Sequence, residues 1–190
     1  MARTRVQNHK LEEFMRKHSP IKEGLVRVKN EDVPFQKYNK ILPRLYIGNF
    51  QAAKDREFFK TKNIKAVLNC TKELDNQFAN NREIEYMRIP VDDSLKERDF
   101  SLMLEYLPVI VAYIHKHVDI QKNTLLSHCV GGRQRSVISV CAYLVTHHNM
   151  TPQQACKFVV DKRPEAFHFG KSLNFSSTLN KYYKELESKK

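Results

Sequence analysis

One short polar turn, set between two strongly apolar segments, limits how this chain can fold. Residues 123–129 read as a short buried strand, and residues 136–148 read as an apolar helix. The turn between them contains Gly131 and Gly132, which let a backbone close tightly. A strand, a tight turn and a helix N-terminus in this order direct backbone N–H groups and the helix dipole at one point. The segment therefore predicts a cradle for an anion such as phosphate.

The side chains of this turn predict what happens to the bound phosphate. Cys129 stands at the floor of the predicted cradle, where the helix dipole and nearby cations favour the reactive thiolate. The planar guanidinium of Arg135 can hold two phosphate oxygens. Ser136 can hydrogen-bond the sulfur and help it to leave in a second step, and His128 is expected to order the loop rather than to act as a base. Together with His128, the remaining residues of the turn are expected to bind the substrate: Val130, Gly131, Gly132, Arg133 and Gln134.

Transfer of a phosphoryl group to sulfur needs an acid that protonates the leaving group. Two carboxylates, Asp92 and Asp93, follow directly after the alternating segment 84–90, which predicts a strand. Their position alone does not choose between them. The alternative interpretation is that both only form a turn or cap the helix that begins near Asp99.

The rest of the chain alternates strands with helices, which predicts an α/β fold with a central, mostly parallel sheet flanked by helices. Pro108 is expected to kink or break one long helix. Residues 1–40 are expected to form an N-terminal helical extension and a linker or edge structure, and residues 41–190 the catalytic domain. A short strand plus turn is predicted over 41–49, with Gly48 and Asn49 ending the strand, and a further strand is predicted over 64–70. The further predicted helices are 1–24, 52–62, 99–118, 152–163 and 174–190.

The segment 128–136 resembles the signature His-Cys-x-x-Gly-x-x-Arg-Ser/Thr of the protein tyrosine phosphatase superfamily. Three further stretches are similar to its small dual-specificity members, including the compact poxvirus type: ILPRLYIGNFQAAKD, IKAVLNCT and AYLVTHHNMTPQQACKFVVDKRPEAF. The similarity departs from the family pattern at Ser172, where many members carry Asn. The resemblance implies the cysteine-phosphatase fold and a cysteinyl-phosphate intermediate formed on Cys129. It also implies that Asp93 is the acid, with Asp92 as the alternative, because the family acid directly precedes Ser, Thr or His.

The resemblance implies a phosphorylated protein as substrate, with phosphotyrosine and phosphoserine or phosphothreonine all accepted. Arg133 departs from the small or apolar residue that many members carry at this place. A second arginine in the cradle indicates a polyanionic substrate as the alternative, either a phosphoinositide or an RNA 5′-end. The arginine could instead point outward and only raise the local potential. A module that binds phosphorylated partners without catalysis is a further alternative.

Charge and composition agree with an anionic substrate. The chain has 33 Lys and Arg residues against 21 Asp and Glu residues, a net charge of +12, which also fits plain solubility. No apolar run approaches the length of a membrane span, and no secretory signal is recognised. The four cysteines lack disulfide or zinc spacing, so we expect reduced thiols, no metal and no cofactor. We therefore expect an intracellular protein, cytoplasmic or nuclear.

Two further expectations concern association and redox control. Leu11, Phe14 and Met15 share one face of the predicted N-terminal helix, and the resemblance to the poxvirus type makes a homodimer through this helix plausible. Cys70 ends a predicted strand whose end should lie beside Cys129. Some tensin-like phosphatases protect the nucleophile through a disulfide to a cysteine at the matching strand end, and this resemblance implies a Cys70–Cys129 disulfide after oxidation. The alternative is that Cys70 is an ordinary small buried residue.

Overall fold

A five-stranded sheet forms the centre of the computed structural model, which describes residues 36–94, 96–167 and 175–189. The strand order is β1-β2-β5-β3-β4. β1 pairs with β2 in antiparallel fashion, and all other neighbouring strands run parallel, which confirms the predicted mostly parallel sheet. The strands are β1 Tyr38–Leu42, β2 Leu45–Gly48, β3 Ile64–Asn69, β4 Glu85–Arg88 and β5 Thr124–His128.

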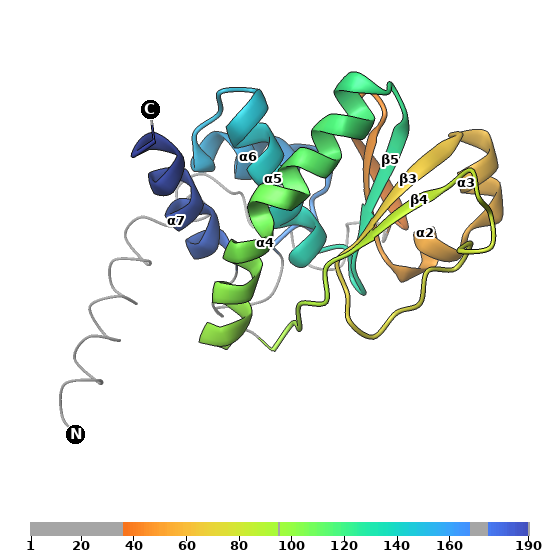
Figure 1. Ribbon diagram of the computed structural model, residues 1–190, viewed down its shortest axis with the longest axis horizontal. Coiled ribbons are helices and arrows are strands. Elements are labelled where there is room, and N and C mark those ends of the chain that lie inside the picture. Colours follow the sequence, from red (N-terminus) through yellow and green to blue (C-terminus); the bar gives the residue numbers. More distant parts are fainter. Residues whose placement is uncertain (1–35, 95, 168–174, 190) are drawn as a thin grey trace. The chain divides into compact units, whose positions relative to one another are not determined.

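Helices cover both faces of this sheet (Figure 1). The longer helices α4 to α7 gather on one side, and the short helices α2 and α3 lie on the other. The helices are α2 Phe50–Lys54, α3 Arg56–Thr61, α4 Glu97–His115, α5 Arg135–His147, α6 Pro152–Lys162 and α7 Ser176–Glu187, and the π-helical turn η1 Lys116–Ile120 continues α4. None of the described helices is long and apolar enough to cross a membrane.

The apolar segments of the sequence become the core. Every side chain of α5 from Arg135 to Val145 is buried, since this helix packs on the sheet and is covered by α4, α6 and α7. On the opposite face, Phe58 and Phe59 of α3 pack against Val67 and Leu126 of the two central strands. The strand β5 therefore runs through the middle of the core and delivers its C-terminal end, His128, to the polar turn.

Two local predictions need correction, and a third is confirmed in part. Asp55 interrupts the single helix predicted over 52–62, because its extended backbone (ψ 97°) ends α2 and its carboxylate caps α3 by accepting the Phe58 N–H at 3.0 Å. The break predicted at Pro108 is wrong, since α4 continues through this residue, and the kink stays a prediction. The edge structure predicted within 25–40 is confirmed at its end, where Tyr38 begins the edge strand β1.

The predicted helix over residues 1–24 lies outside the described residues. Its apolar face of Leu11, Phe14 and Met15 and the boundary between an extension and a catalytic domain at residue 40 stay predictions.

Candidate active site

The turn between β5 and α5 is held in place through its carbonyl groups. Four of them in a row accept hydrogen bonds from outside the turn: Val130 from the Phe50 N–H (3.0 Å), Gly131 and Gly132 from the Arg163 guanidinium (3.4 and 2.7 Å), and Arg133 from the Phe167 N–H (2.8 Å). The C=O and N–H of a trans peptide point in opposite directions. The N–H groups of residues 131–134 therefore face away from these partners, toward the concave side of the turn. This is the geometry that an anion cradle requires.

Gly132 is the glycine on which this geometry depends. Its φ of +64° lies in the left-handed region. A Cβ atom there would lie 2.6 Å from the Gly48 carbonyl oxygen and 2.7 Å from the Arg163 guanidinium. At Gly131 the nearest contacts would be the aliphatic part of the Arg133 side chain at 3.6 Å, which is ordinary van der Waals distance. The two glycines that look alike in the sequence thus have different roles.

The structure brings Cys129, Ser136 and Arg135 to this one turn. The Cys129 thiol lies at the bottom with 1% exposure, and its Sγ is 3.4 Å from Ser136 Oγ. Arg135 is equally buried and donates to the Val91 carbonyl at 3.0 Å. Val91 precedes the two candidate acids, so Arg135 connects the turn to the loop that carries them.

Asp93 and Asp92 have different surroundings. Asp93 Oδ2 lies 3.5 Å from the Arg135 guanidinium, and burial raises the pKa of this carboxyl although Arg135 opposes the shift. Asp92 points to Lys72, at 3.3 Å, and this pairing lowers its pKa. The first turn of α4 is capped by Asp99, which accepts the Lys96 N–H at 3.4 Å, so neither candidate is needed as a helix cap. A half-buried carboxyl with a raised pKa beside Arg135 suits a proton donor, which favours Asp93.

Other predicted lining residues differ in exposure. Val130 is 39% exposed, whereas Gln134 is 1% exposed and its amide has no hydrogen-bond partner among the described residues. Burial lowers the pKa of His128 to about 4, so its imidazole is neutral at pH 7. Its Nδ1 has no hydrogen-bond partner among the described residues, so the ordering role expected for His128 stays a prediction. Arg133 is half-buried in the turn.

Sequence reasoning missed Glu73. Its Oε1 lies 3.4 Å from both terminal nitrogens of Arg135, and its charge is one cause of the raised pKa of Asp93. Glu73 lies in the polar segment 71–83, where nothing in the sequence marks it. It therefore contacts the Arg135 guanidinium as a second carboxylate beside Asp93.

Sequence reasoning also missed Arg163. The residue is fully buried at the end of α6. Besides the two glycine carbonyls of the turn, it donates to Asn39 Oδ1 at 2.5 Å. An arginine before Pro164 at a helix end carries no sequence signal that would place it under the turn.

Cys70 follows the end of β3, directly beside the turn. Its backbone N–H donates to the His128 carbonyl at 2.8 Å, and its Sγ lies 3.4 Å from Ser139 Oγ. Burial raises the pKa of the Cys70 thiol to about 12, and all four cysteines are free. The protective Cys70–Cys129 disulfide stays a prediction, to be checked by mass spectrometry after mild peroxide treatment.

The histidines of α4 and α5 do not form a metal site. The rings of His115 and His147 stack with centroids 4.1 Å apart, and His115 bonds to Asp119 at 2.7 Å. Across the part of the chain that the structure describes, no group of three or more His, Cys, Asp or Glu side chains could hold a metal ion.

A parallel sheet whose central strand runs into a Cys–turn–Arg segment at the start of a buried helix defines the class of cysteine-dependent phosphatases. The comparisons with known proteins agree. A family model described as "Dual specificity phosphatase, catalytic domain" matches residues 45–185. The chain belongs to this family.

Curated relatives and solved structures give the same assignment. The chain is 32% identical to the dual specificity protein phosphatase Mpk3 of Drosophila melanogaster over 139 residues, or 71% of this chain and 33% of that protein. It is 30% identical to the dual specificity protein phosphatase 22-B of Danio rerio over 77% of this chain and 82% of that protein. The crystal structure of human DUSP28 matches with 26% identity and a TM-score of 0.68, over 82% of this chain and 97% of that one. The crystal structure of a mouse putative dual specificity phosphatase complexed with zinc tungstate matches with 25% identity and a TM-score of 0.69, over 86% of this chain and 96% of that one. The chain spans about one third of the length of the first curated relatives that it matches.

The different roles of the two glycines can be tested as a matched pair. We expect Gly132→Ala to weaken binding of inorganic phosphate at least about tenfold and to lower the free energy of unfolding by more than about 1 kcal/mol, because Ala is strained at a positive φ. Gly131→Ala should change both quantities much less. Titration calorimetry and urea unfolding measure the two effects, and equal behaviour of the two variants would contradict the assignment.

The contact between Glu73 and Arg135 predicts a change in pH dependence. The acid works while it is protonated, so activity falls as the pH rises through the pKa of Asp93. Glu73 raises this pKa, and Glu73→Gln should therefore move the basic limb of the kcat/KM profile to lower pH. The control is Asp75→Asn, since the Asp75 side chain is 95% exposed and pairs only loosely with Arg88 at 3.9 Å. A basic limb that stays in place in Glu73→Gln would refute the role of Glu73.

Proposed function

We propose that this chain hydrolyses phosphotyrosine and phosphoserine or phosphothreonine in proteins through a cysteinyl-phosphate intermediate. One observation carries the proposal: a thiol, a hydroxyl, a guanidinium and a carboxyl with a raised pKa converge on one anion cradle. Cys129 and Ser136 lie 3.4 Å apart, and Arg135 lies 3.5 Å from Asp93. Family membership supports the same activity.

In the first step the Cys129 thiolate attacks the phosphorus of the bound phosphate ester. A sulfur–phosphorus bond forms while the ester oxygen–phosphorus bond breaks, and Asp93 gives its proton to the leaving oxygen. The backbone N–H groups of the cradle and the Arg135 guanidinium hold the phosphoryl oxygens and stabilise their charge in the transition state. Arg135 exchanges its contacts with Glu73 and Asp93 for contacts with the substrate.

In the second step a water molecule attacks the phosphorus of the cysteinyl phosphate. Asp93, now a carboxylate, accepts a proton from this water, and the sulfur–phosphorus bond breaks. The Ser136 hydroxyl donates a hydrogen bond to the sulfur as negative charge develops there. Inorganic phosphate leaves, and the Cys129 thiolate is restored.

Phosphorylated proteins fit the family as substrates, because the curated relatives are dual specificity protein phosphatases. The comparisons do not favour a phosphoinositide or an RNA 5′-end, and only the additional basic residue Arg133 supports such a polyanionic substrate. Binding without catalysis is not favoured either, since Cys129, Arg135 and Asp93 are all present.

Association and location are proposals of the same kind. Leu11, Phe14 and Met15 share one face of the helix that the sequence predicts over residues 1–24, and this pattern supports a homodimer through that predicted helix, which sedimentation at high concentration would test. The lack of disulfide or zinc spacing among the four cysteines supports an intracellular location, cytoplasmic or nuclear, which imaging of the tagged protein would test.

Turnover of a substrate panel tests the proposed activity. The wild-type protein should hydrolyse an aryl phosphate and phosphopeptides, and it should prefer phosphopeptides to a phosphoinositide or a 5′-triphosphorylated RNA. Cys129→Ser should abolish turnover but keep tungstate binding, because the cradle is made of backbone N–H groups. Arg135→Lys should lose most of kcat, since Lys cannot form the bidentate contact. Substantial turnover in Cys129→Ser would refute the mechanism.

The choice between the two aspartates gives a separate test. Asp93→Ala should lower kcat by about 10²- to 10⁴-fold, the usual contribution of a positioned general acid, and the loss should shrink for esters with good leaving groups. Asp92→Ala is the matched control and should keep most of kcat. The reverse pattern in steady-state kinetics would make Asp92 the acid.

A further inference from the structure

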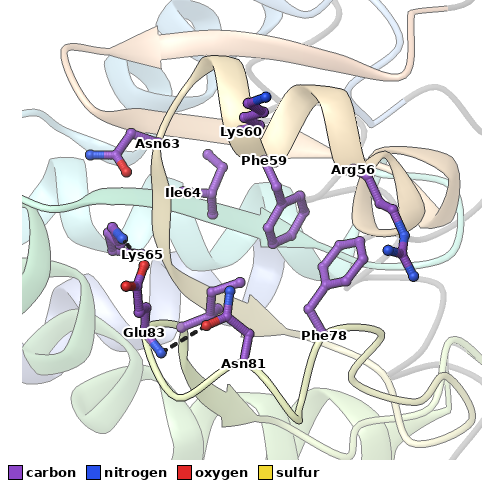
Figure 2. A pocket seen from close by; sticks show the side chains of 10 residues that line it. Arg56, Phe59, Lys60, Asn63, Ile64, Lys65, Phe78, Asn81 and Glu83 are labelled. Carbon is purple, nitrogen blue, oxygen red and sulfur yellow. Dashed lines mark hydrogen bonds and ion pairs between the residues drawn. The ribbon is translucent and has the colours of Figure 1, made fainter.

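A pocket of about 380 Å³ lies between α3, the start of β3 and the loop that precedes β4 (Figure 2). Asn63, Ile64 and Lys65 bring the first residues of β3 into its wall. The other end of β3, at Asn69, pairs with His128 beside the candidate active site. A strand rises about 3.3 Å per residue, so roughly 20 Å of sheet separates the pocket from the catalytic turn. The pocket is thus a separate site.

The floor of the pocket is apolar. Phe59 and Ile64 are buried in the core cluster, and Phe78 and Ile84 are partly buried against it. The rings of Phe59 and Phe78 meet edge to face with centroids 4.6 Å apart. Figure 2 shows these two rings facing each other, one from α3 and one from the opposite loop. Such a floor suits one large apolar side chain.

The rim of the pocket is basic. Arg56, Lys60 and Lys65 surround the opening, against one acidic residue, Glu83. Lys65 pairs with Glu83 at 2.6 Å, and the Arg56 guanidinium lies 5.8 Å from the centre of the Phe78 ring. Within residues 36–94, 96–167 and 175–189, no carboxylate forms an ion pair with Arg56 or Lys60. These two cations are available to acidic groups of a ligand.

We propose that this pocket binds an acidic peptide segment with one large apolar side chain, located in the substrate protein away from its phosphorylated residue. The apolar side chain contacts the phenylalanine floor, and neighbouring Asp or Glu residues pair with Arg56 and Lys60. The amide side chains of Asn63 and Asn81 at the rim can hydrogen-bond a peptide backbone. The inference rests on the proposed function, since it assigns the peptide to a phosphoprotein substrate.

Charge complementarity favours a peptide over a free phosphate group. The N-terminus of α3 is occupied by its own cap, because Asp55 accepts the Phe58 N–H at 3.0 Å and pairs with Lys37 at 2.9 Å. No backbone cradle is therefore left for phosphate at this helix end. The cations of the rim sit on long side chains that can adapt to carboxylates at several spacings.

Binding at this pocket raises the local concentration of the phosphorylated residue at Cys129. An extended chain spans about 3.3–3.6 Å per residue, so about six residues or more must separate the acidic segment from the phosphorylated residue. The docked segment should lower KM for such substrates and leave kcat unchanged, because it does not contact the reacting atoms.

Peptide binding by the full chain gives the first test. The probe is a fluorescent peptide of Asp and Glu residues around one Phe, titrated by fluorescence polarisation. We expect the double variant Arg56→Glu with Lys60→Glu to bind it at least about tenfold more weakly, and a peptide with Ala in place of Phe to bind the wild type more weakly. The matched control is Lys62→Glu, because Lys62 is exposed at the end of the same helix and does not line the pocket.

The outcomes separate this inference from the proposed function. Wild-type affinity in the double variant, equal weakening by Lys62→Glu, or equal binding of the Phe and Ala peptides would overturn the docking site. A phosphopeptide joined to the acidic segment should show a KM several-fold lower than the phosphopeptide alone, with the wild type but not with the double variant. Turnover of an aryl phosphate should be the same in the wild type, the double variant and Lys62→Glu. If the wild type does not turn over the aryl phosphate, the proposed function is refuted. The polarisation measurement would still decide whether the pocket binds the peptide.

Discussion

The buried guanidinium of Arg163 orients the turn on which the candidate chemistry depends. Burial of a charge is costly, and burial also lowers the pKa of this group. The cost is offset by carbonyl groups of the turn, by the Asn39 side chain at 2.5 Å and by Glu165 at 4.0 Å. Because Gly131 and Gly132 direct their carbonyl groups to Arg163, the following N–H groups must face the opposite side. One cation outside the cradle thus sets the direction of the donors within it.

Local sequence order was sufficient to predict the central part of the site. Cys129, Arg135 and Ser136 belong to one turn, so their spacing and the flanking apolar segments already indicate that they meet. Glu73 contacts Arg135 but stands 62 residues before it in the sequence. Arg163 contacts Gly132 but stands 31 residues after it. Their contacts exist only once the sheet and α6 are in place, and no periodicity or motif in one sequence encodes them. The break at Asp55 was missed for a local reason, because the apolar pattern of the sequence continues across this residue. In the structure Asp55 ends α2 and caps the start of α3.

The two adjacent aspartates show where sequence reasoning reaches its limit. From position alone Asp92 and Asp93 were equivalent, and only the family resemblance chose between them. Neighbouring side chains distinguish them in the structure, because Asp92 pairs with the exposed Lys72 while Asp93 lies half-buried beside Arg135 and Glu73. Burial raises the pKa of Asp93, and the hydrogen bond from Lys72 lowers the pKa of Asp92, so two identical side chains shift in opposite directions.

The outside partners of the turn also have a consequence for folding. These partners come from two segments that lie far apart along the chain: the Phe50 amide comes from the start of α2, and the Arg163 guanidinium and the Phe167 amide come from the turn that follows α6. Contacts between distant segments form late in folding, because their loop-closure entropy is repaid only once the native sheet and helices are in place. No subdomain of the described residues contains a complete cradle. Oxyanion binding should therefore report on the integrity of the whole fold and disappear with its global cooperative unfolding.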